Sequence, residues 1–319
     1  MKKKVVIIYG NCHTIAFSKY LTLCEEFNSK YTIFPIKPIQ DVKDPTYFEM
    51  KEIKNCDVFI HQSIRENNRY GKEYSSANII AKLKPTCQII AIPNVYHLPT
   101  CFYPQYTEEK ELLYNGRTYF FRDKIIDEEV KNGKHIKEIV NTYHNYVFDE
   151  KSIIEDYHNF IDKVKKREQE WDIKVSDFIL KNTKQMQLFY DPNHPTNALI
   201  KYYAQEVLKK LLDDSFSISE LMDFRLDSYE MPIHEIVYKA LNLDYKSGQK
   251  EMRITGMKIY EEKMYLKQYV SQYFAMLWTC GEFDKFITLK SRIYFEKYRI
   301  LQFCKKVINK IAILIKRRG

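Results

Sequence analysis

The sequence alternates between short apolar runs and segments of helical periodicity through its first two thirds, and this alternation constrains the fold most. The first run, residues 4–9, is continuous and rich in β-branched residues, as expected of a strand covered on both faces. Further strand-like runs lie at 31–36, 58–61, 88–92 and 185–190. Segments typical of helices lie at 13–27, 75–84 and 195–212. Repeated strand–helix units predict an α/β fold, with a three-layer, doubly wound parallel sheet.

The pattern changes near residues 213–217, and we expect a boundary there. Residues 1–214 are predicted to form the α/β domain, interrupted by a helical insertion at about 107–181. Residues 215–290 are expected to form a mostly helical C-terminal subdomain, and 291–319 a basic amphipathic tail. With 319 residues and 45% hydrophobic content, the chain is long enough to bury a large core.

Charge and cysteine usage narrow the classes of function. The net charge is +9, but eight Lys or Arg residues and no acidic one follow Glu296, so the rest of the chain carries only +1. Nucleic-acid binding is therefore not expected. Seven cysteines, an odd number without a C-x-x-C pair, are expected to be reduced thiols of a cytoplasmic protein. The apolar start stops at Gly10, too early for a signal peptide core, and no run approaches transmembrane length.

Polar residues follow the predicted strands where each one ends. These residues are Cys12 and His13 after the first strand, Gln62 after the third, Asn94 and His97 after the fourth, and Asp191 and His194 after the fifth. In an open parallel sheet, ligands bind outside the carboxyl ends of the strands. We therefore expect these side chains to converge on one site.

Cys12 is the candidate nucleophile of this site. At a helix N-terminus, the dipole and free N–H groups stabilise a thiolate and can receive a developing oxyanion. Gly10 permits a close approach of the chain, and Asn11 is a cap or a second donor. In Asp191-x-x-His194, the carboxylate can hold one ring nitrogen while the other faces the nucleophile. No second pair of ligands completes a metal site, so none is expected.

These motifs resemble a known family. "GNC" after the first strand and "DPNHPT" before a late helix resemble the SGNH/GDSL hydrolases, with Cys in place of Ser. The combination is most similar to the WcbI-type polysaccharide biosynthesis acetyltransferases, which have an SGNH-like fold and bind coenzyme A. Similar features continue in "CDVFIHQSI", "IIAIPNVYH" and "MPIHEIVYKALNL", so the resemblance covers about residues 4–275.

The resemblance implies roles for individual residues. Cys12 matches the nucleophile, His194 the base and Asp191 its orienting acid. It further implies an oxyanion or substrate-binding group that consists of Gly10, Asn11, His13, Gln62, Asn94 and His97. Two departures affect this group: no Gly stands near Gln62, and Asn94 lacks the Gly and Asp that SGNH enzymes carry beside it. The implied activity is transfer of an acetyl group from acetyl-CoA to a sugar of a capsular or other surface polysaccharide, or its precursor.

Several alternatives stay open at the level of sequence. Acyl transfer can pass through an acyl-cysteine, or His194 can deprotonate a sugar hydroxyl that attacks acetyl-CoA directly. An esterase or thioesterase on the same scaffold is the second hypothesis, and a non-catalytic protein that binds coenzyme A or glycan is the third. In the tail, apolar residues at helical spacing oppose basic ones, so residues 297–319 are expected to contact the inner face of a membrane. A helix docked on its own domain or on a partner fits the same pattern.

Overall fold

The computed structural model describes most of the chain before residue 213 and parts of the remainder. The described residues are 2–96, 98–107, 112–114, 117–119, 122–212, 216, 218, 231–245, 252–254, 257–259, 266–267, 269–271, 273–274 and 277. His97, most of the predicted helical subdomain and the whole basic tail lie outside them. The chain divides into two units, Met1–Pro104 with Phe148–Lys258 and Gln105–Val147 with Ile259–Gly319. The domain bounds predicted from the sequence stay predictions.

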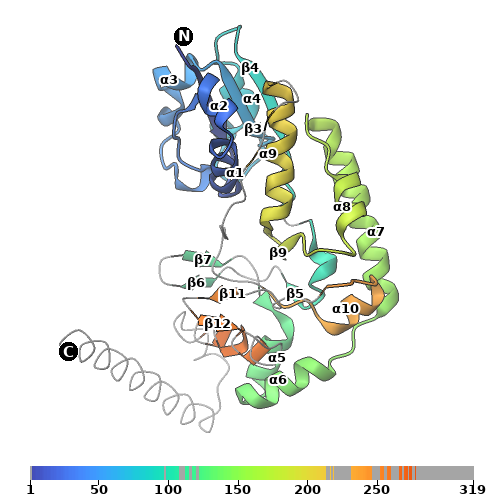
Figure 1. Ribbon diagram of the computed structural model, residues 1–319. Helices are drawn as coiled ribbons and strands as arrows, with labels where there is room; N and C mark the ends of the chain where they lie inside the picture. Colours follow the sequence, from blue (N-terminus) through green and yellow to red (C-terminus); the bar gives the residue numbers. More distant parts are fainter. Residues whose placement is uncertain are drawn as a thin grey trace, which may run out of the picture. The chain divides into compact units, whose positions relative to one another are not determined.

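The first unit contains a four-stranded parallel sheet (Figure 1). Its strands, in the spatial order β2-β1-β3-β4, are β1 (Lys4–Tyr9), β2 (Tyr31–Ile33), β3 (Val58–Gln62) and β4 (Gln88–Ile92). The register pairs Tyr9 with His61 and Gln62 with Ile92, so the carboxyl ends of the three longest strands meet at one edge. Four of the predicted strands and the α/β class are thereby confirmed.

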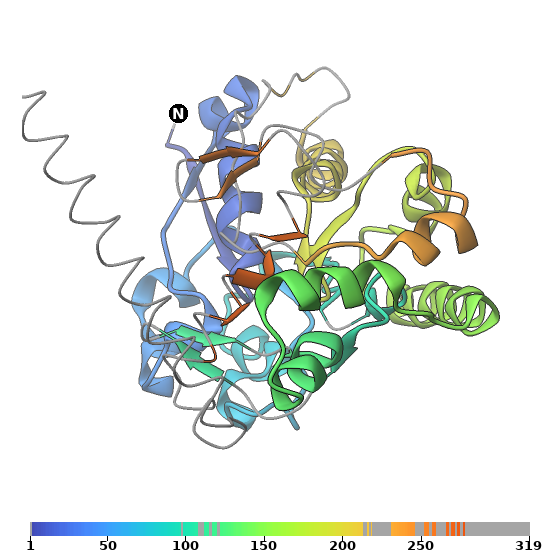
Figure 2. The ribbon, with the colours of Figure 1, turned by 90° about the horizontal axis from the view of Figure 1, so that it is seen from below.

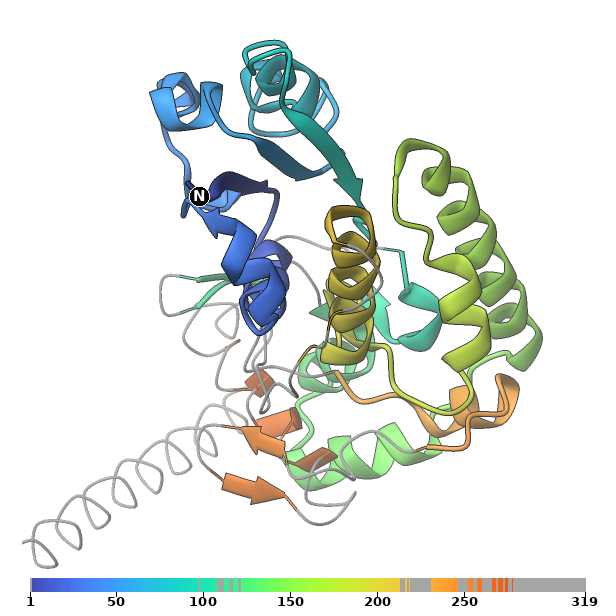
Figure 3. The same cartoon turned by 45° about the horizontal axis from the view of Figure 1, so that its top comes forward.

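Helices of this unit flank the sheet. Its α-helices are α1 (His13–Thr22), α2 (Glu25–Lys30), α3 (Lys51–Lys54), α4 (Ser76–Ile80), α7 (Glu150–Arg167), α8 (Ser176–Asn182), α9 (Asn197–Leu211) and α10 (Glu235–Ala240). Its short 3-10 helices are η1 (Ile39–Asp41), η2 (Pro45–Glu49), η3 (Lys72–Tyr74), η4 (Thr100–Phe102) and η5 (Glu168–Glu170). Helices α1 and α9 pack together, and α7 and α8 lie side by side (Figures 1 and 3).

Helix α9 shows why the late segment is helical. Leu199, Tyr203 and Val207 recur at helical spacing and are all buried, so one face of the helix belongs to the core. The prediction of a helix at 195–212 is confirmed, with a start at Asn197 because Pro195 belongs to a strand. None of the described helices is long and apolar enough to cross a membrane.

The predicted helix at 13–27 is divided in two. Its break lies at Cys24, whose backbone is extended and whose thiol accepts the Phe27 N–H of the next helix at 3.4 Å. Cys24 is therefore an N-cap in the middle of an apolar pattern, and periodicity alone carries no sign of it.

The predicted fifth strand departs from the observed structure more than the divided helix does. It is shortened to β9 (Phe189–Asp191), which among the described residues pairs antiparallel with β10 (His194–Pro195) and not with the parallel sheet. The backbone before Asp191 is occupied by other partners: the carbonyl of Leu188 accepts the Thr196 N–H, and that of Tyr190 accepts the Met231 N–H. Only the last two positions of the predicted run are therefore strand, and they belong to a sheet other than the predicted one.

The second unit contains much of the predicted insertion. It begins with short strands, β5 (Tyr106–Thr107), β6 (Leu112–Tyr114), β7 (Arg117–Tyr119) and β8 (Arg122–Asp123), where we expected helix. Helices α5 (Lys124–Lys131) and α6 (Ile136–Asn145) follow and lie side by side (Figure 2). Two further strands, β11 (Met252–Ile254) and β12 (Met257–Ile259), pair with each other and lie at the end of the first unit, except for Ile259, where the second unit resumes.

Candidate active site

The turn between β1 and α1 is fixed by a buried glutamine. Gln62 Oε1, at the end of β3, accepts the Asn11 N–H at 2.8 Å. Gly10 permits this approach, since a Cβ there would lie 2.4 Å from the same oxygen. Asn11 Oδ1 accepts the His13 N–H at 3.0 Å and closes the first turn of the helix. Cys12 consequently stands at the N-cap of α1, half-buried, with no capping bond from its own side chain.

The second half of the site is the turn that joins β9 to β10. The Asp191 carboxylate is fully buried, and its Oδ1 accepts the N–H groups of Asn193 at 2.7 Å and His194 at 3.0 Å. Its Oδ2 lies 2.8 Å from His194 Nδ1. A ring nitrogen that faces a carboxylate must carry the proton, so Nδ1 donates and Nε2 points the other way.

Cys12 and His194 meet across 182 positions of sequence. Cys12 Sγ lies 3.8 Å from His194 Nε2, within hydrogen-bonding range for sulfur. The structure thus brings together the three residues to which the sequence assigned chemistry, as a line from thiol to imidazole to carboxylate. This geometry allows His194 to exchange a proton with Cys12 while Asp191 holds the ring.

Electrostatics favour a positive charge on His194. Burial opposes that charge, but the Asp191 carboxylate and its hydrogen bond outweigh burial, and Cys12 adds to them. The pKa of His194 is therefore raised well above its usual range. An imidazolium at this distance places a proton donor beside the sulfur of the candidate nucleophile.

His13 has the opposite character. Burial, with a further contribution from His194, lowers the pKa of His13 to about 3, so its ring is neutral. Its Nε2 donates to the backbone carbonyl of Asn193 at 2.6 Å. The two imidazole rings are 5.9 Å apart. His13 thus ties the first turn of α1 to the loop that carries Asp191 and His194.

The other predicted residues are placed as follows. The Gln62 side chain accepts from Asn11 and donates to the Pro93 carbonyl at 3.3 Å. Asn94 Oδ1 accepts the Tyr96 N–H at 3.3 Å, and within the described chain its amide nitrogen has no hydrogen-bond partner. Within the described chain, the Cys12 backbone N–H also has no hydrogen-bond partner. His97 lies outside the described residues.

Sequence reasoning gave no role to Arg167, which contacts a predicted site residue, and placed Tyr96 only close behind the fourth strand. Arg167, at the end of α7, donates to the Asn94 carbonyl at 3.1 Å across 73 positions, and no motif indicates this contact. Burial raises the pKa of Tyr96, the charge of Arg69 opposes this, and Cys12 is among its other electrostatic neighbours. The position of Tyr96 just after the fourth strand was the available signal.

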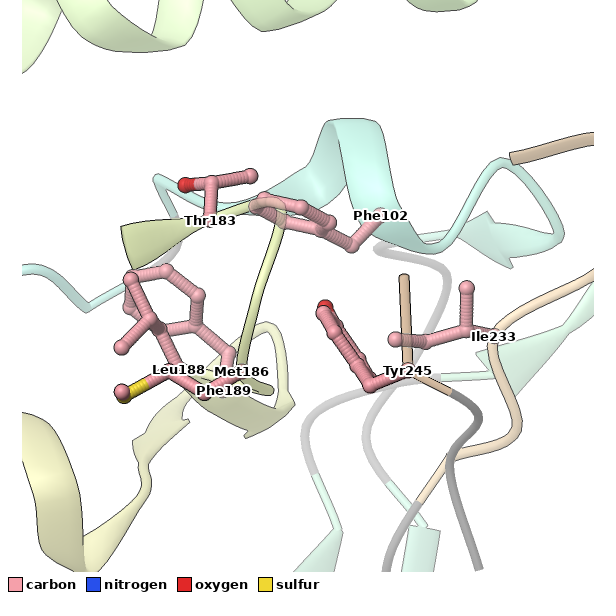
Figure 4. Close-up of a pocket in the computed structure, with 7 residues that line it drawn as sticks. All are labelled: Phe102, Thr183, Met186, Leu188, Phe189, Ile233 and Tyr245. Atoms are coloured by element: carbon pink, nitrogen blue, oxygen red, sulfur yellow. The ribbon is translucent and has the colours of Figure 1, made fainter. Parts of the chain in front are cut away.

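An apolar pocket in the same unit is separate from this chemistry (Figure 4). Its lining consists of Phe102, Thr183, Met186, Leu188, Phe189, Ile233 and Tyr245. None of these is a candidate for catalysis, although Phe189 precedes Asp191 by two positions. In the part of the chain that the structure describes, no group of three or more His, Cys, Asp or Glu residues is arranged to hold a metal ion.

Comparison with known proteins agrees with the resemblance found in the sequence. A solved structure, described as WcbI, a polysaccharide biosynthesis enzyme, in native form without a disulfide bond between coenzyme A and a cysteine, matches with a TM-score of 0.64 and 21% identity. The match covers 92% of this chain and 98% of that one, and at this identity it shows the fold. No curated protein matches the chain. The family model described as "Polysaccharide biosynthesis enzyme WcbI" matches residues 5–212, well over half of the sequence. The chain therefore belongs to the WcbI family of polysaccharide biosynthesis enzymes.

Proposed function

We propose that the protein is an O-acyltransferase that moves an acetyl group from acetyl-CoA to a sugar hydroxyl of a capsular or other surface polysaccharide, or of its precursor. The observation that carries this proposal is the contact of Cys12 with His194 and of His194 with Asp191, in a chain of the WcbI family. The order of these residues along the chain resembles that of the SGNH hydrolases, with a thiol in place of the hydroxyl.

The first half-reaction transfers the acetyl group to the enzyme. The Cys12 thiolate attacks the thioester carbon of acetyl-CoA, so a new carbon–sulfur bond forms while the bond to the coenzyme A sulfur breaks. The coenzyme A thiolate takes the proton that His194 holds. One thioester replaces another, and the step is nearly balanced in energy. The raised pKa of His194 supports this route because the ring already carries the proton that the leaving group needs.

The second half-reaction transfers the group to the sugar. His194, now neutral, accepts the proton of the sugar hydroxyl as the oxygen attacks the acyl carbon, and Cys12 leaves as a thiolate. The product is an oxygen ester, which is more stable than the thioester, so this step runs downhill. Because Nε2 faces the sulfur at 3.8 Å, the geometry supports the covalent route over direct attack on acetyl-CoA.

Both steps develop negative charge on the carbonyl oxygen. The groups best suited to stabilise it are the Cys12 backbone N–H and the Asn94 amide, which have no hydrogen-bond partner among the described residues. Gln62 holds Asn11 and thus shapes the turn that presents the N–H. Loss of one such donor costs roughly 3–4 kcal/mol of barrier in acyl-transfer enzymes.

Coenzyme A is proposed as the donor because of the structural relative. That protein is described as native and without a disulfide bond between coenzyme A and a cysteine, so its description relates the coenzyme A thiol to a cysteine. We propose that Cys12 is the corresponding thiol in this chain. A thiol that reaches the coenzyme A sulfur also reaches the adjacent acetyl carbon.

The test uses acetyl-CoA labelled in the acetyl group together with candidate nucleotide sugars. We expect label to appear on the sugar and, after rapid acid quench without acceptor, on Cys12. Cys12→Ala and His194→Ala should abolish both signals. Unchanged transfer by both variants would refute the assignment. Release of free acetate that does not depend on the acceptor would favour the hydrolase, and binding of coenzyme A without turnover would favour the non-catalytic alternative.

A further inference from the structure

Two cysteines outside the active site lie in contact with each other. Cys56 precedes β3 by two residues, Cys87 directly precedes β4, and their sulfur atoms are 3.5 Å apart. Both residues lie at the amino ends of their strands, whereas Cys12 follows the carboxyl end of β1. The pair therefore lies at the edge of the sheet opposite the proposed acyl-transfer site.

The backbone around the pair is held on both sides. The Gln88 N–H donates to the Asp57 carbonyl and the Lys84 N–H to the Lys54 carbonyl, each at 2.9 Å. An ion pair joins Lys84 Nζ to Asp57 Oδ1 at 2.6 Å. These contacts fix the two loops against each other, so the closeness of the sulfur atoms follows from the register of β3 and β4. A disulfide of about 2.05 Å would need the sulfur atoms to approach by only about 1.5 Å.

We propose that Cys56 and Cys87 form a dithiol site that reacts with peroxides and closes into a reversible disulfide, independently of acyl transfer. The chemical partner is a hydroperoxide, with hydrogen peroxide as the simplest member of the class. The restoring partner is a low-molecular-weight thiol or dithiol. In a reducing compartment such a bond is transient, as is typical of regulatory disulfides.

The two thiols differ in the way that such a site requires. Cys87 is half-buried and accessible to a small oxidant, whereas Cys56 has no exposed surface. The hydrogen bond from Cys56 lowers the pKa of Cys87, and the positive charge of Lys84 contributes in the same direction. The same hydrogen bond, together with burial, raises the pKa of Cys56. Cys87 is therefore the thiol that attacks, and Cys56 is the one that resolves.

The reaction balances in two steps. The Cys87 thiolate attacks one oxygen of hydrogen peroxide, the O–O bond breaks, and the other oxygen leaves as hydroxide, which takes up the proton that the Cys87 thiol released and becomes water. Cys87 is then a sulfenic acid. Cys56 loses its proton and attacks the sulfenic sulfur, so the S–S bond forms, the S–O bond breaks, and a second water leaves. In total, two thiols are oxidised to one disulfide and one peroxide is reduced to two waters.

The experiment uses the full chain with Cys12→Ser, so that the reactive thiol of the active site does not consume oxidant. Stoichiometric hydrogen peroxide should lower the mass by about 2 Da, and dithiothreitol should reverse the change. Peptide mapping should show a link between Cys56 and Cys87. With Cys56→Ala added, Cys87 should accumulate as a sulfenic acid that dimedone traps, whereas with Cys87→Ser added, Cys56 should stay reduced.

Several outcomes would overturn the proposal. One is that both thiols remain open to alkylation after treatment at a peroxide level that oxidises Cys12 in the unsubstituted chain. Another is that Cys87 is oxidised to a sulfenic or higher acid and forms no disulfide even with Cys56 present. A third is an equal yield of dimedone adduct with and without Cys56, which would mean that Cys56 does not resolve the intermediate. No readout uses acetyl transfer, so failure here is distinguishable from failure of the proposed function.

Discussion

The clearest test of the site is Asp191→Asn, because it removes one charge and leaves the loop intact. Asp191 Oδ1 accepts two backbone N–H groups, from Asn193 and His194. The carbonyl oxygen of an asparagine side chain can accept both. Its amide would then replace Oδ2, 2.8 Å from His194 Nδ1, and would present a donor to a donor. The ring must change tautomer, which places a proton on Nε2, the atom that faces Cys12.

The size of the effect follows from the lost charge. Two unit charges about 4 Å apart attract each other by about 4 kcal/mol at an effective dielectric constant of about 20. If His194 is an imidazolium in the transition state, the variant loses that stabilisation, which corresponds to roughly a thousandfold in rate. We expect this loss in kcat/KM for acetyl transfer, with little change in thermal stability.

Two measurements check the argument. Acetyl transfer is compared between the unsubstituted chain, Asp191→Asn and Asp44→Asn, an exposed helix cap in which a carboxylate also accepts a backbone N–H and where no change is expected. Alkylation of Cys12 by iodoacetamide at neutral pH provides a readout that needs no acceptor, and it should slow in Asp191→Asn. A loss below about tenfold in transfer, with unchanged alkylation, would refute a role for Asp191 in charging His194.

Three further predictions concern the scaffold. Gly10→Ala places a Cβ 2.4 Å from Gln62 Oε1, so we expect the free energy of unfolding, measured with urea, to fall by about 1–3 kcal/mol. An unchanged urea midpoint would contradict the close approach of these groups. The pKa of His13 is lowered from about 6.5 to about 3, so the unfolded chain binds more protons between these values and stability falls as pH drops from 6.5. His13→Gln should flatten this fall by up to about 1.4 kcal/mol per pH unit, and an unaltered pH profile of unfolding would show that the ring is not held neutral. Leu199→Ala, at a fully buried position of α9, should lower the free energy of unfolding in urea by about 2–5 kcal/mol. Leu180→Ala, at a position 41% exposed, should lower it by less than about 1 kcal/mol. Equal losses in the two variants would contradict the packing of α9.

The sequence was informative where local pattern determines local structure. Continuous β-branched runs predicted the strands of the parallel sheet, and helical spacing of Leu199, Tyr203 and Val207 predicted α9, because burial of one face leaves a periodic trace. The pattern failed at Cys24, where a single side-chain bond breaks a helix, and in the strands at the start of the second unit.

The types of residue in the candidate site were also accessible from sequence. The carboxyl ends of parallel strands converge in a sheet, which accounts for Cys12 and Gln62. Asp191 and His194 belong to strands outside that sheet, and only their spacing in the sequence marked them. The contacts that these residues make could not be predicted from the sequence. The partners of Asn94 and His13 come from α7 and from the loop after β9, and no local pattern specifies contacts over 73 and 180 positions. The choice of partner for Gln62 shapes the nucleophile turn and leaves the Cys12 N–H without a partner among the described residues, and it is likewise a product of packing.

The amino-acid sequence by itself determined that a thiol stands at a strand tip and that an acid precedes a histidine by three residues in a late turn. Only the tertiary structure decided that the sulfur and the imidazole lie 3.8 Å apart, and that Cys56 and Cys87 lie in contact. The physical reason is the same for both pairs. Strand and helix preferences act over a few neighbouring residues, whereas the distance between remote side chains is set by strand register and by the packing of helices such as α1 on α9.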